Sequence, residues 1–341
     1  MNDSSGSPLL SGDNSFGRFQ FVREAPEIAF TSVIILTMAA LVGTFGNLLI
    51  MVSVCHTIKR KSLEFIFMGN LAVSDTFVTL IVDPINILGK LEGERIFHYI
   101  PGFCRAIACM CTISCVNSLG SIVLMSSSRY ISICHHNLYK RIFKRSTCLV
   151  MCVSLYLIGL LLILLNLAGI GDHSFNRKSL ECIWDRMTTY YYTVSFTVIF
   201  VWVPLIVTGI FYCLIFIKFR ASTKRISHST STGHNKKPMY LAKSLFLIYA
   251  AFAICWIPYA ILMVADRNDS FPYEIHVLIT TLAHLHPSFN WLVLYYTNTL
   301  FRNAFNKLVK FDKCFKKFSK KTRQVGNETV VSTVMISHNT K

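Results

Sequence analysis

The sequence predicts an all-α membrane protein, a bundle of seven transmembrane helices with an amphipathic eighth helix. Of the 341 residues, 53% are hydrophobic and only 15% are charged, whereas soluble domains carry roughly 25% charged residues. The apolar residues form seven long runs, and a run of about 20 such residues crosses a bilayer. Basic residues concentrate in alternate loops, which is typical of chains that cross a membrane several times.

Each of the seven runs is long enough to span a hydrocarbon core of ~30 Å. The predicted spans are Ile28–Cys55, Leu63–Leu88, Cys104–Cys134, Thr147–Gly169, Tyr190–Phe219, Leu241–Ala265 and Ile275–Thr297. A buried soluble core is the alternative, and seven such runs in one chain argue against it. We therefore expect a disordered outer N-terminus over residues 1–27, the bundle over 28–299, a membrane-surface helix over 300–318 and a disordered inner tail over 319–341.

The net charge of +17 is unevenly distributed, because Lys and Arg follow spans one, three and five and fill the chain after span seven. By the positive-inside rule these segments face the cytosol. We expect a multi-pass protein of the plasma membrane with its N-terminus outside. A basic chain could bind nucleic acid, but here the charge follows the loops, so anionic membrane lipids are the favoured partner.

Only two of the twelve cysteines, Cys104 and Cys182, fall on the predicted outer side of the membrane. An oxidising compartment would join them in a disulfide. Asn2 and Asn268 begin glycosylation sequons on the same side. No metal-ligand spacing is found among the cysteines.

The chain after span seven places phenylalanines three or four residues apart among lysines, from Phe301 to Phe318. This pattern predicts an amphipathic helix on the inner leaflet. Cys314 within it is a candidate for palmitoylation, and an unmodified thiol is the alternative.

Polar residues inside the predicted spans are expected to face the interior of the bundle. Asp75, Ser118 and Asn290 are candidates for an ion site, because an ionised carboxylate such as Asp75 requires a cation or a proton there. Trp256 and Pro258 place a bulky ring beside a helix kink in span six. Arg129-Tyr130 ends span three, where charge near hydrocarbon is costly unless it is used.

These motifs together resemble the rhodopsin-like (class A) G-protein-coupled receptors, from about residue 28 to 318. The matching residues are Gly46-Asn47, Leu71-Ala72-Val73-Ser74-Asp75, Cys104, Arg129-Tyr130, Cys182, Pro204 with Tyr212, Cys255-Trp256-Ile257-Pro258, Asn290 and Phe301-Arg302. The resemblance implies that Arg129, Tyr130 and Tyr212 contribute to G-protein coupling. It implies that Trp256, Pro258, Asn290 and Asp75 act as the activation switch.

The resemblance also implies partners. A heterotrimeric G protein, here of an inhibitory type, would bind the cytosolic side, and arrestin and receptor kinases would use Ser and Thr of the loop and tail. The implied ligand is an extracellular small molecule or lipid, with a peptide as the alternative. The stretch Ser128–His135 looks like melatonin receptors, and Asn166 and Trp184 fall where those receptors bind ligand. Phe200 stands where they carry a histidine.

Several residues depart from the family pattern. Ser128 replaces the acidic residue that normally holds the arginine, and Pro238 stands where some relatives carry a second acidic partner. We therefore expect an unrestrained Arg129 and activity without ligand. His286 and Pro287 replace polar neighbours of Asp75, which argues against the sodium ion that the family would imply there. The family's span-seven tyrosine is lost or displaced to Tyr295.

Seven residues are candidates for ligand binding: Asp83, Cys111, Asn166, Trp184, Trp202, Tyr259 and His284. Cys111 stands where amine receptors carry an aspartate, so an amine ligand is disfavoured. His284 stands at the lysine position of opsins, so retinal is excluded. Asp83 is expected to pair with Arg105, and a cationic ligand group is the alternative.

Two other function classes fit the sequence less well than a receptor. A transporter would show internal repeats and interrupted spans in paired positions, and the sequence has neither. A membrane enzyme would need a nucleophile or a metal set, and His284 and His286 point to different faces of one helix. The remaining alternative is a constitutively active or orphan receptor-like protein.

Overall fold

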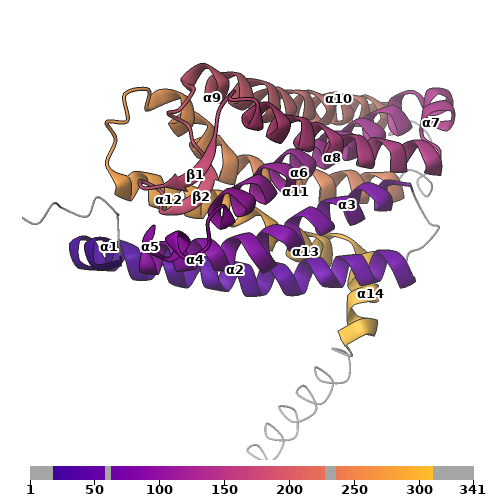
Figure 1. Cartoon of the computed structure of the whole chain (residues 1–341). Helices are drawn as coiled ribbons and strands as arrows, with labels where there is room; N and C mark the ends of the chain where they lie inside the picture. The colour runs from indigo at the N-terminus through magenta and orange to yellow at the C-terminus, as the bar shows by residue number, and fades with distance from the viewer. Residues whose placement is uncertain (1–17, 58–62, 227–235, 310–341) are drawn as a thin grey trace, which may run out of the picture.

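The computed structural model describes residues 18–57, 63–226 and 236–309, and its helices run side by side as one elongated bundle (Figure 1). Seven helical segments are long and apolar enough to cross a membrane. They are Pro26–His56, Glu64–Glu92, Phe103–Cys134, Arg145–Leu167, Tyr190–Ala221, Ala242–Ala265 and Tyr273–Thr297. The seven predicted spans are therefore confirmed, with ends that differ by a few residues.

Each span is built from one or more helical elements. The first half of the chain contains α1 (Arg18–Glu24), α2 (Pro26–Val52), η1 (Ser53–Thr57), α3 (Glu64–Phe77), η2 (Val78–Val82), α4 (Asp83–Glu92), α5 (Arg95–His98), α6 (Phe103–Cys134), α7 (His136–Ile142) and α8 (Arg145–Leu167). The second half contains β1 (His173–Asn176), β2 (Glu181–Trp184), α9 (Tyr190–Thr197), η3 (Val198–Trp202), α10 (Val203–Ile226), α11 (Lys236–Ala265), α12 (Tyr273–Ala283), α13 (His286–Thr297) and α14 (Thr299–Val309).

Prolines follow two of the three π-helical turns that the structure describes. The π-helical segments η2 and η3 end two residues before Pro84 and Pro204. A proline lacks the N–H that an α-helix needs and its ring crowds the preceding turn, so a wider turn accommodates it. Pro287 similarly stands in the first turn of α13, where span seven is interrupted after α12.

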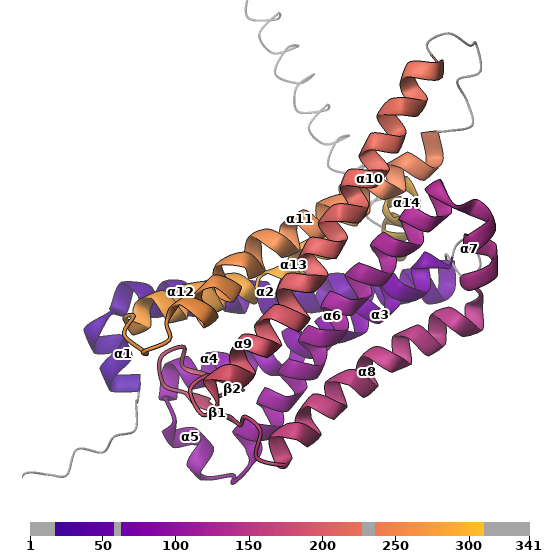
Figure 2. The same ribbon diagram turned by 90° about the horizontal axis from the view of Figure 1, so that it is seen from above.

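The third span, α6, is the central element of the bundle. It packs against α3, α8, α10 and the strand β2, and in Figure 2 it runs between its neighbouring spans. The outward faces of α8 and α10 instead expose large apolar side chains, such as Val150, Leu157, Ile206 and Ile217. This apolar exterior is expected of helices that face lipid.

A β-hairpin covers one end of the bundle (Figure 1). Its strands β1 and β2 pair antiparallel, with Phe175 opposite Cys182. Cys182 forms a disulfide with Cys104 at the start of α6, with an S–S distance of 2.05 Å. The predicted disulfide is thus confirmed. We call this end of the molecule the hairpin end and the opposite end, at Arg129, the arginine end.

The helix α1 was not expected from the sequence. Its Phe21 is fully buried against Leu180 of the hairpin turn and Val277 of α12, and it meets the Tyr273 ring edge to face at 6.0 Å. These contacts require the folded hairpin and α12, which come from distant parts of the chain. Part of the predicted disordered N-terminus therefore packs on the hairpin end.

The helix α14 follows span seven at the arginine end and runs across the bundle axis (Figure 1). Phe301 and Phe305 are buried on one of its faces, where Phe301 meets Phe65 of α3 at 5.5 Å and Phe305 stacks on Tyr295. The rest of the expected surface helix, including Cys314, lies outside the described residues, as do Asn2 and the predicted tail.

Candidate functional site

A cavity lies beneath the hairpin, between α6, α11 and the two halves of span seven. Its lining includes Cys111, Cys115, Ser118, Ile183, Trp184, Trp256, Tyr259, Thr280, His284 and His286. The cavity measures about 20 Å³, which is room for one water molecule. A larger ligand therefore requires the surrounding side chains to move apart.

Four of the predicted ligand-binding residues meet in this cavity, namely Cys111, Trp184, Tyr259 and His284. Two others lie elsewhere. Asn166 accepts a hydrogen bond from the Tyr192 hydroxyl at 3.3 Å and donates to the Ile170 carbonyl at 3.2 Å. Trp202 packs half-buried in η3. Sequence position alone could not distinguish the two groups, because the residues that line the cavity come from several elements that meet only in the folded bundle.

Trp184 forms the roof of the cavity. Its ring lies 4.6 Å from that of Phe196 and 5.8 Å from that of Tyr259, between centroids. The indole Nε1 is buried and has no hydrogen-bond partner. A buried donor without a partner is costly, so a ligand that accepts a hydrogen bond from Trp184 would relieve this cost.

The expected ion pair between Asp83 and Arg105 is wrong. Asp83 is fully buried, and its Oδ1 lies 2.6 Å from Nδ1 of His284. Arg105 lies on the outside of α6, where its guanidinium is 3.1 Å from Asp172. The pairing follows burial, because a buried carboxylate gains most from a partner that is also withdrawn from water.

The Asp83–His284 pair continues into the hairpin. Nε2 of His284 lies 3.7 Å from Glu181 Oε2, and Nζ of Lys90 lies 2.6 Å from Glu181 Oε1 and donates to the Ser179 carbonyl at 2.9 Å. All four ionisable groups are buried. They join span two, the hairpin and span seven above the cavity. The hairpin is therefore attached to the bundle by these ion pairs as well as by the disulfide.

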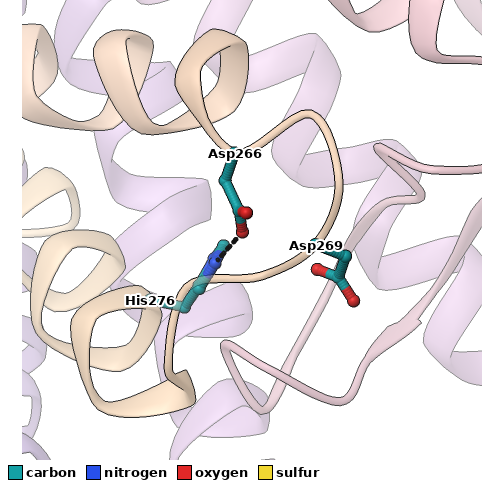
Figure 3. Close-up of side chains that lie close together, drawn as sticks. All are labelled: Asp266, Asp269 and His276. Atoms are coloured by element: carbon teal, nitrogen blue, oxygen red, sulfur yellow. Dashed lines mark hydrogen bonds and ion pairs between the residues drawn. The ribbon is translucent and has the colours of Figure 1, made fainter.

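A second ionic cluster fastens the hairpin to the loop between α11 and α12. Figure 3 shows Asp266, Asp269 and His276, and Nε2 of His276 lies 2.8 Å from Asp266 Oδ2. Arg186 pairs with both aspartates, at 2.9 Å to Asp266, and Lys178 lies 3.1 Å from Asp269. The possible metal-ligand atoms of Asp266, Asp269 and His276 lie within 4.8 Å of one another. Since both carboxylates are already paired with cations, we interpret the group as an ion-pair cluster.

The electrostatics of Asp266 agree with this interpretation. Burial alone would raise the pKa of its carboxyl group, but hydrogen bonds from His276 and from the backbone N–H groups of Phe271 and Ser270, with the nearby Arg186, lower the pKa to about 2. The carboxylate therefore stays ionised at neutral pH. Asn268, the predicted glycosylation site, lies exposed in the same loop.

Asp75 lies deeper in the bundle and is fully buried. It accepts hydrogen bonds from Ser118 Oγ at 2.9 Å and from Asn290 Nδ2 at 2.5 Å, and His286 Nε2 lies 3.6 Å from its Oδ1. Three predicted ion-site residues are thus together. A sodium ion, which is hard like Ca²⁺ and Mg²⁺, would need oxygen ligands. Asp75 and Ser118 offer oxygens, but span seven presents Asn290 Nδ2 and His286 Nε2 to the carboxylate, and these nitrogens do not fit the ion.

Trp256 connects this deeper site to the cavity. Its indole Nε1 donates to His286 Nδ1 at 3.1 Å, and its ring stacks on Phe252 with 5.4 Å between centroids. Pro258 lies inside α11, two residues further along. The predicted switch residues Trp256 and Asp75 are therefore linked through His286, and Asn290 joins them through its hydrogen bond to Asp75.

At the arginine end, the expectation of an unrestrained Arg129 is wrong. Its guanidinium forms a buried ion pair with Glu64 at the start of α3, and Ser128 Oγ lies 3.5 Å from the same carboxylate. Glu64 thus supplies the carboxylate that position 128 lacks. The signal was visible in the sequence, because an acidic residue inside a predicted span is a functional candidate.

The other two coupling candidates pack beside this pair. Tyr130 stacks on Phe211 with 5.2 Å between ring centroids, and Tyr212 is buried against Tyr249 at 5.6 Å. Both tyrosines therefore join α6, α10 and α11 where these helices approach the arginine end.

The comparisons with known proteins agree with this geometry. The family profile described as "7 transmembrane receptor (rhodopsin family)" matches residues 46–295. The chain therefore belongs to the rhodopsin family of seven-transmembrane receptors, which are class A G-protein-coupled receptors and not enzymes.

Within that family the chain is similar to melatonin receptors. It is 23% identical over 288 residues to melatonin receptor type 1A of Mus musculus, and the matched region covers 83% of this chain and 81% of the relative. It is 24% identical over 293 residues to melatonin receptor type 1B of Homo sapiens, with 82% and 78% covered. The similarity to melatonin receptor type 1B-A of Danio rerio is 22% over 237 residues, with 69% and 81% covered.

Proposed function

We propose that this receptor binds an extracellular ligand in the cavity beneath the hairpin and activates a heterotrimeric G protein of the inhibitory class. The proposal places the hairpin end outside the cell and the arginine end in the cytosol of a plasma-membrane protein. The observation that carries it is the continuous contact path from the cavity through Trp256 and His286 to Asp75.

The chemistry of the cavity supports a flat and largely apolar ligand. Aromatic side chains form its roof and walls, and the unpartnered indole N–H of Trp184 would bind an acceptor on the ligand. Asp83 and Glu181 are already paired with His284, which lines the cavity, and with Lys90. A strongly cationic ligand would therefore find no free counter-charge among these groups.

The relatives are named melatonin receptors, so melatonin is the first ligand to test. Phe200, at the position of the melatonin-receptor histidine, packs against Phe196 at 5.4 Å and offers no hydrogen bond. We therefore expect a ligand that resembles melatonin in shape but relies less on polar contacts on the fifth span.

The proposed mechanism is a shift between two packings of the bundle. A ligand that enlarges the cavity moves Trp256, and α11 pivots at Pro258. Arg129 leaves Glu64 and turns toward Tyr212, which opens a cleft for the G protein. Such a shift is driven only by the difference in ligand affinity between the two packings.

The test is G-protein activation in cells, measured by dissociation of labelled inhibitory, stimulatory and phospholipase-coupled G proteins during a screen of melatonin and other flat aromatic compounds. Cys115→Phe should abolish the response, because the larger ring fills the cavity that Cys115 lines. Cys213→Phe is the matched control, since Cys213 is exposed on α10.

Both variants must reach the cell surface in equal amounts. An unchanged response of Cys115→Phe would place the ligand elsewhere and contradict the proposal. Activation of the stimulatory class alone would contradict the choice of G protein.

A further inference from the structure

We propose that the imidazole of His286 takes the place of a metal cation beside Asp75 and couples this carboxylate to Trp256. Under this proposal sodium does not bind at Asp75. The state of the deeper site then depends on where the proton of His286 lies. This inference goes beyond the proposed function, because it concerns how Asp75, at the deep end of the ligand cavity, is neutralised and holds whatever the ligand is.

The first observation is the set of groups around Asp75. Each of its oxygens accepts a hydrogen bond, Oδ1 from Ser118 and Oδ2 from Asn290. His286 Nε2 lies 3.6 Å from Oδ1, and it is buried with no other hydrogen-bond partner. An N–H at this nitrogen directs its partial positive charge at the carboxylate. It thereby takes the place that a bound cation would otherwise occupy.

The second observation concerns the other ring nitrogen. His286 Nδ1 lies 3.1 Å from Trp256 Nε1 and 2.9 Å from the Ala283 carbonyl oxygen. That carbonyl has no α-helical donor, because Pro287, four residues on, lacks an N–H. The indole can only donate and the carbonyl can only accept, so Nδ1 cannot serve both at once.

Two states of the ring follow. While Trp256 donates to Nδ1, that nitrogen carries no proton, and the ring proton lies on Nε2, facing Asp75. When Trp256 moves away, Nδ1 can carry a proton and donate it to Ala283. Since Trp256 lines the ligand cavity, movement of its indole changes the charge balance at Asp75 without an ion.

The first experiment measures the melting temperature of the purified full-length protein in about 0.15 M sodium chloride or choline chloride. Wild type should melt at the same temperature in both salts. His286→Ser replaces the ring by a small oxygen ligand, and sodium should then raise the melting temperature by about 2 °C or more. Adding Asp75→Asn should remove this gain.

His286→Phe is the matched control, because it keeps the ring volume but offers no ligand atom, and it should gain no response to sodium. A wild-type protein that sodium stabilises, with the effect lost in Asp75→Asn, would overturn the proposal. So would a well-folded His286→Ser protein that ignores sodium. Should His286→Ser fail to fold, the comparison of wild type with Asp75→Asn still decides the matter.

The second experiment tests the coupling. The changes in melting temperature caused by Asp75→Asn and Trp256→Phe should be non-additive when His286 is present and additive in the His286→Phe background. Additivity in both backgrounds would refute the link. Neither measurement involves a G protein, so a failure here is distinguishable from a failure of the proposed function.

Discussion

Single residues at the arginine end illustrate how one charge pair can be rebuilt from a different helix. The family's acidic neighbour of Arg129 is absent, and Ser128 stands in its place. Glu64 approaches from α3 and forms the ion pair instead. Breaking one partner of a buried pair is expensive because it leaves the other charge without compensation. We therefore interpret the described packing as a resting state that Glu64 helps to hold.

Glu64→Gln should raise ligand-independent G-protein turnover by about fivefold or more, since losing a restraint of ~1 kcal/mol shifts the balance between packings by that factor. Ser128→Asp should change it little, because the arginine already has a partner. Glu27→Gln, at an exposed position on α2, is the control. Basal turnover of Glu64→Gln equal to wild type, at equal surface expression, would show that the pair does not hold the resting packing.

His173 in β1 links stability to pH. Burial lowers the pKa of its imidazole from 6.5 to about 4, although Asp172 nearby acts in the opposite direction. The imidazole of His173 therefore binds a proton less readily in the folded protein than in the unfolded chain. The contribution of His173 to the free energy of unfolding is fully present above about pH 6.5. It is lost as the pH drops toward 4, by on the order of 3 kcal/mol.

Between pH 7 and pH 5 (about the middle of this window), the melting temperature of His173→Gln should therefore fall less than that of wild type. The glutamine can keep a polar contact with Thr112, which lies 2.9 Å from Nε2 of His173. His98→Gln, at an exposed site, should behave as wild type. Identical pH profiles for all three proteins would exclude His173 as a source of the dependence.

At the scale of elements, the packing of α2 against α13 depends on a close approach. A Cβ atom on Gly46 would lie 1.8 Å from Cδ1 of Trp291, so the glycine is required by the bulky ring that follows Asn290. In the same contact, Asn47 Nδ2 donates to the Pro287 carbonyl at 3.1 Å. The displaced proline and the tryptophan of span seven are therefore accommodated by span one.

Gly46→Ala should destabilise the protein by about 1–3 kcal/mol, the usual cost of overpacking a tight contact. Gly69→Ala is the matched control, because the nearest atom to its added Cβ is 3.6 Å away, and alanine favours the helix. Thermal unfolding measures both. Trp291→Leu combined with Gly46→Ala should recover part of the loss, and an equal stability of the two single alanine variants would contradict this account.

At the scale of the whole molecule, the hairpin end is closed by several independent fastenings. The disulfide ties the hairpin to α6, the Lys90–Glu181–His284–Asp83 chain ties it to spans two and seven, and Arg186 ties it to the loop before α12. The arginine end carries fewer such restraints among the described residues. We infer that activation opens the arginine end while the hairpin end changes little.

The proposed orientation is testable by glycosylation. The hairpin end should face outward, so Asn268 should carry a glycan in cells, as should Asn2. Removal of N-glycans should increase gel mobility, and Asn268→Gln should remove part of that shift. Asn327 begins a third sequon, Asn-Glu-Thr, in the predicted cytosolic tail, so Asn327→Gln is the control without effect. A shift that depended on Asn327 instead would reverse the orientation.

Span number, receptor class and the disulfide were all predictable from the sequence. The span number and the disulfide depend on local composition and on sorting residues to one side of the membrane, and a bilayer imposes both along the chain. The receptor class followed instead from the resemblance of the motifs to a known family. Cys104 and Cys182 are an example, because only two cysteines could meet outside. Asp75, Trp256 and Asn290 were likewise selected by motif, and their role as a switch stays a prediction.

The pairing of buried charges was decided by the tertiary structure. The sequence predicted Asp83 with Arg105 and an unrestrained Arg129, whereas the folded chain pairs Asp83 with His284 and Arg129 with Glu64. The partners are separated by many residues and lie on different helices. Which of them meet depends on the rotation and depth of each span. The π-helical turns and the breaks at prolines set the rotation and depth of each span, and the spacing of residues along the sequence does not determine either.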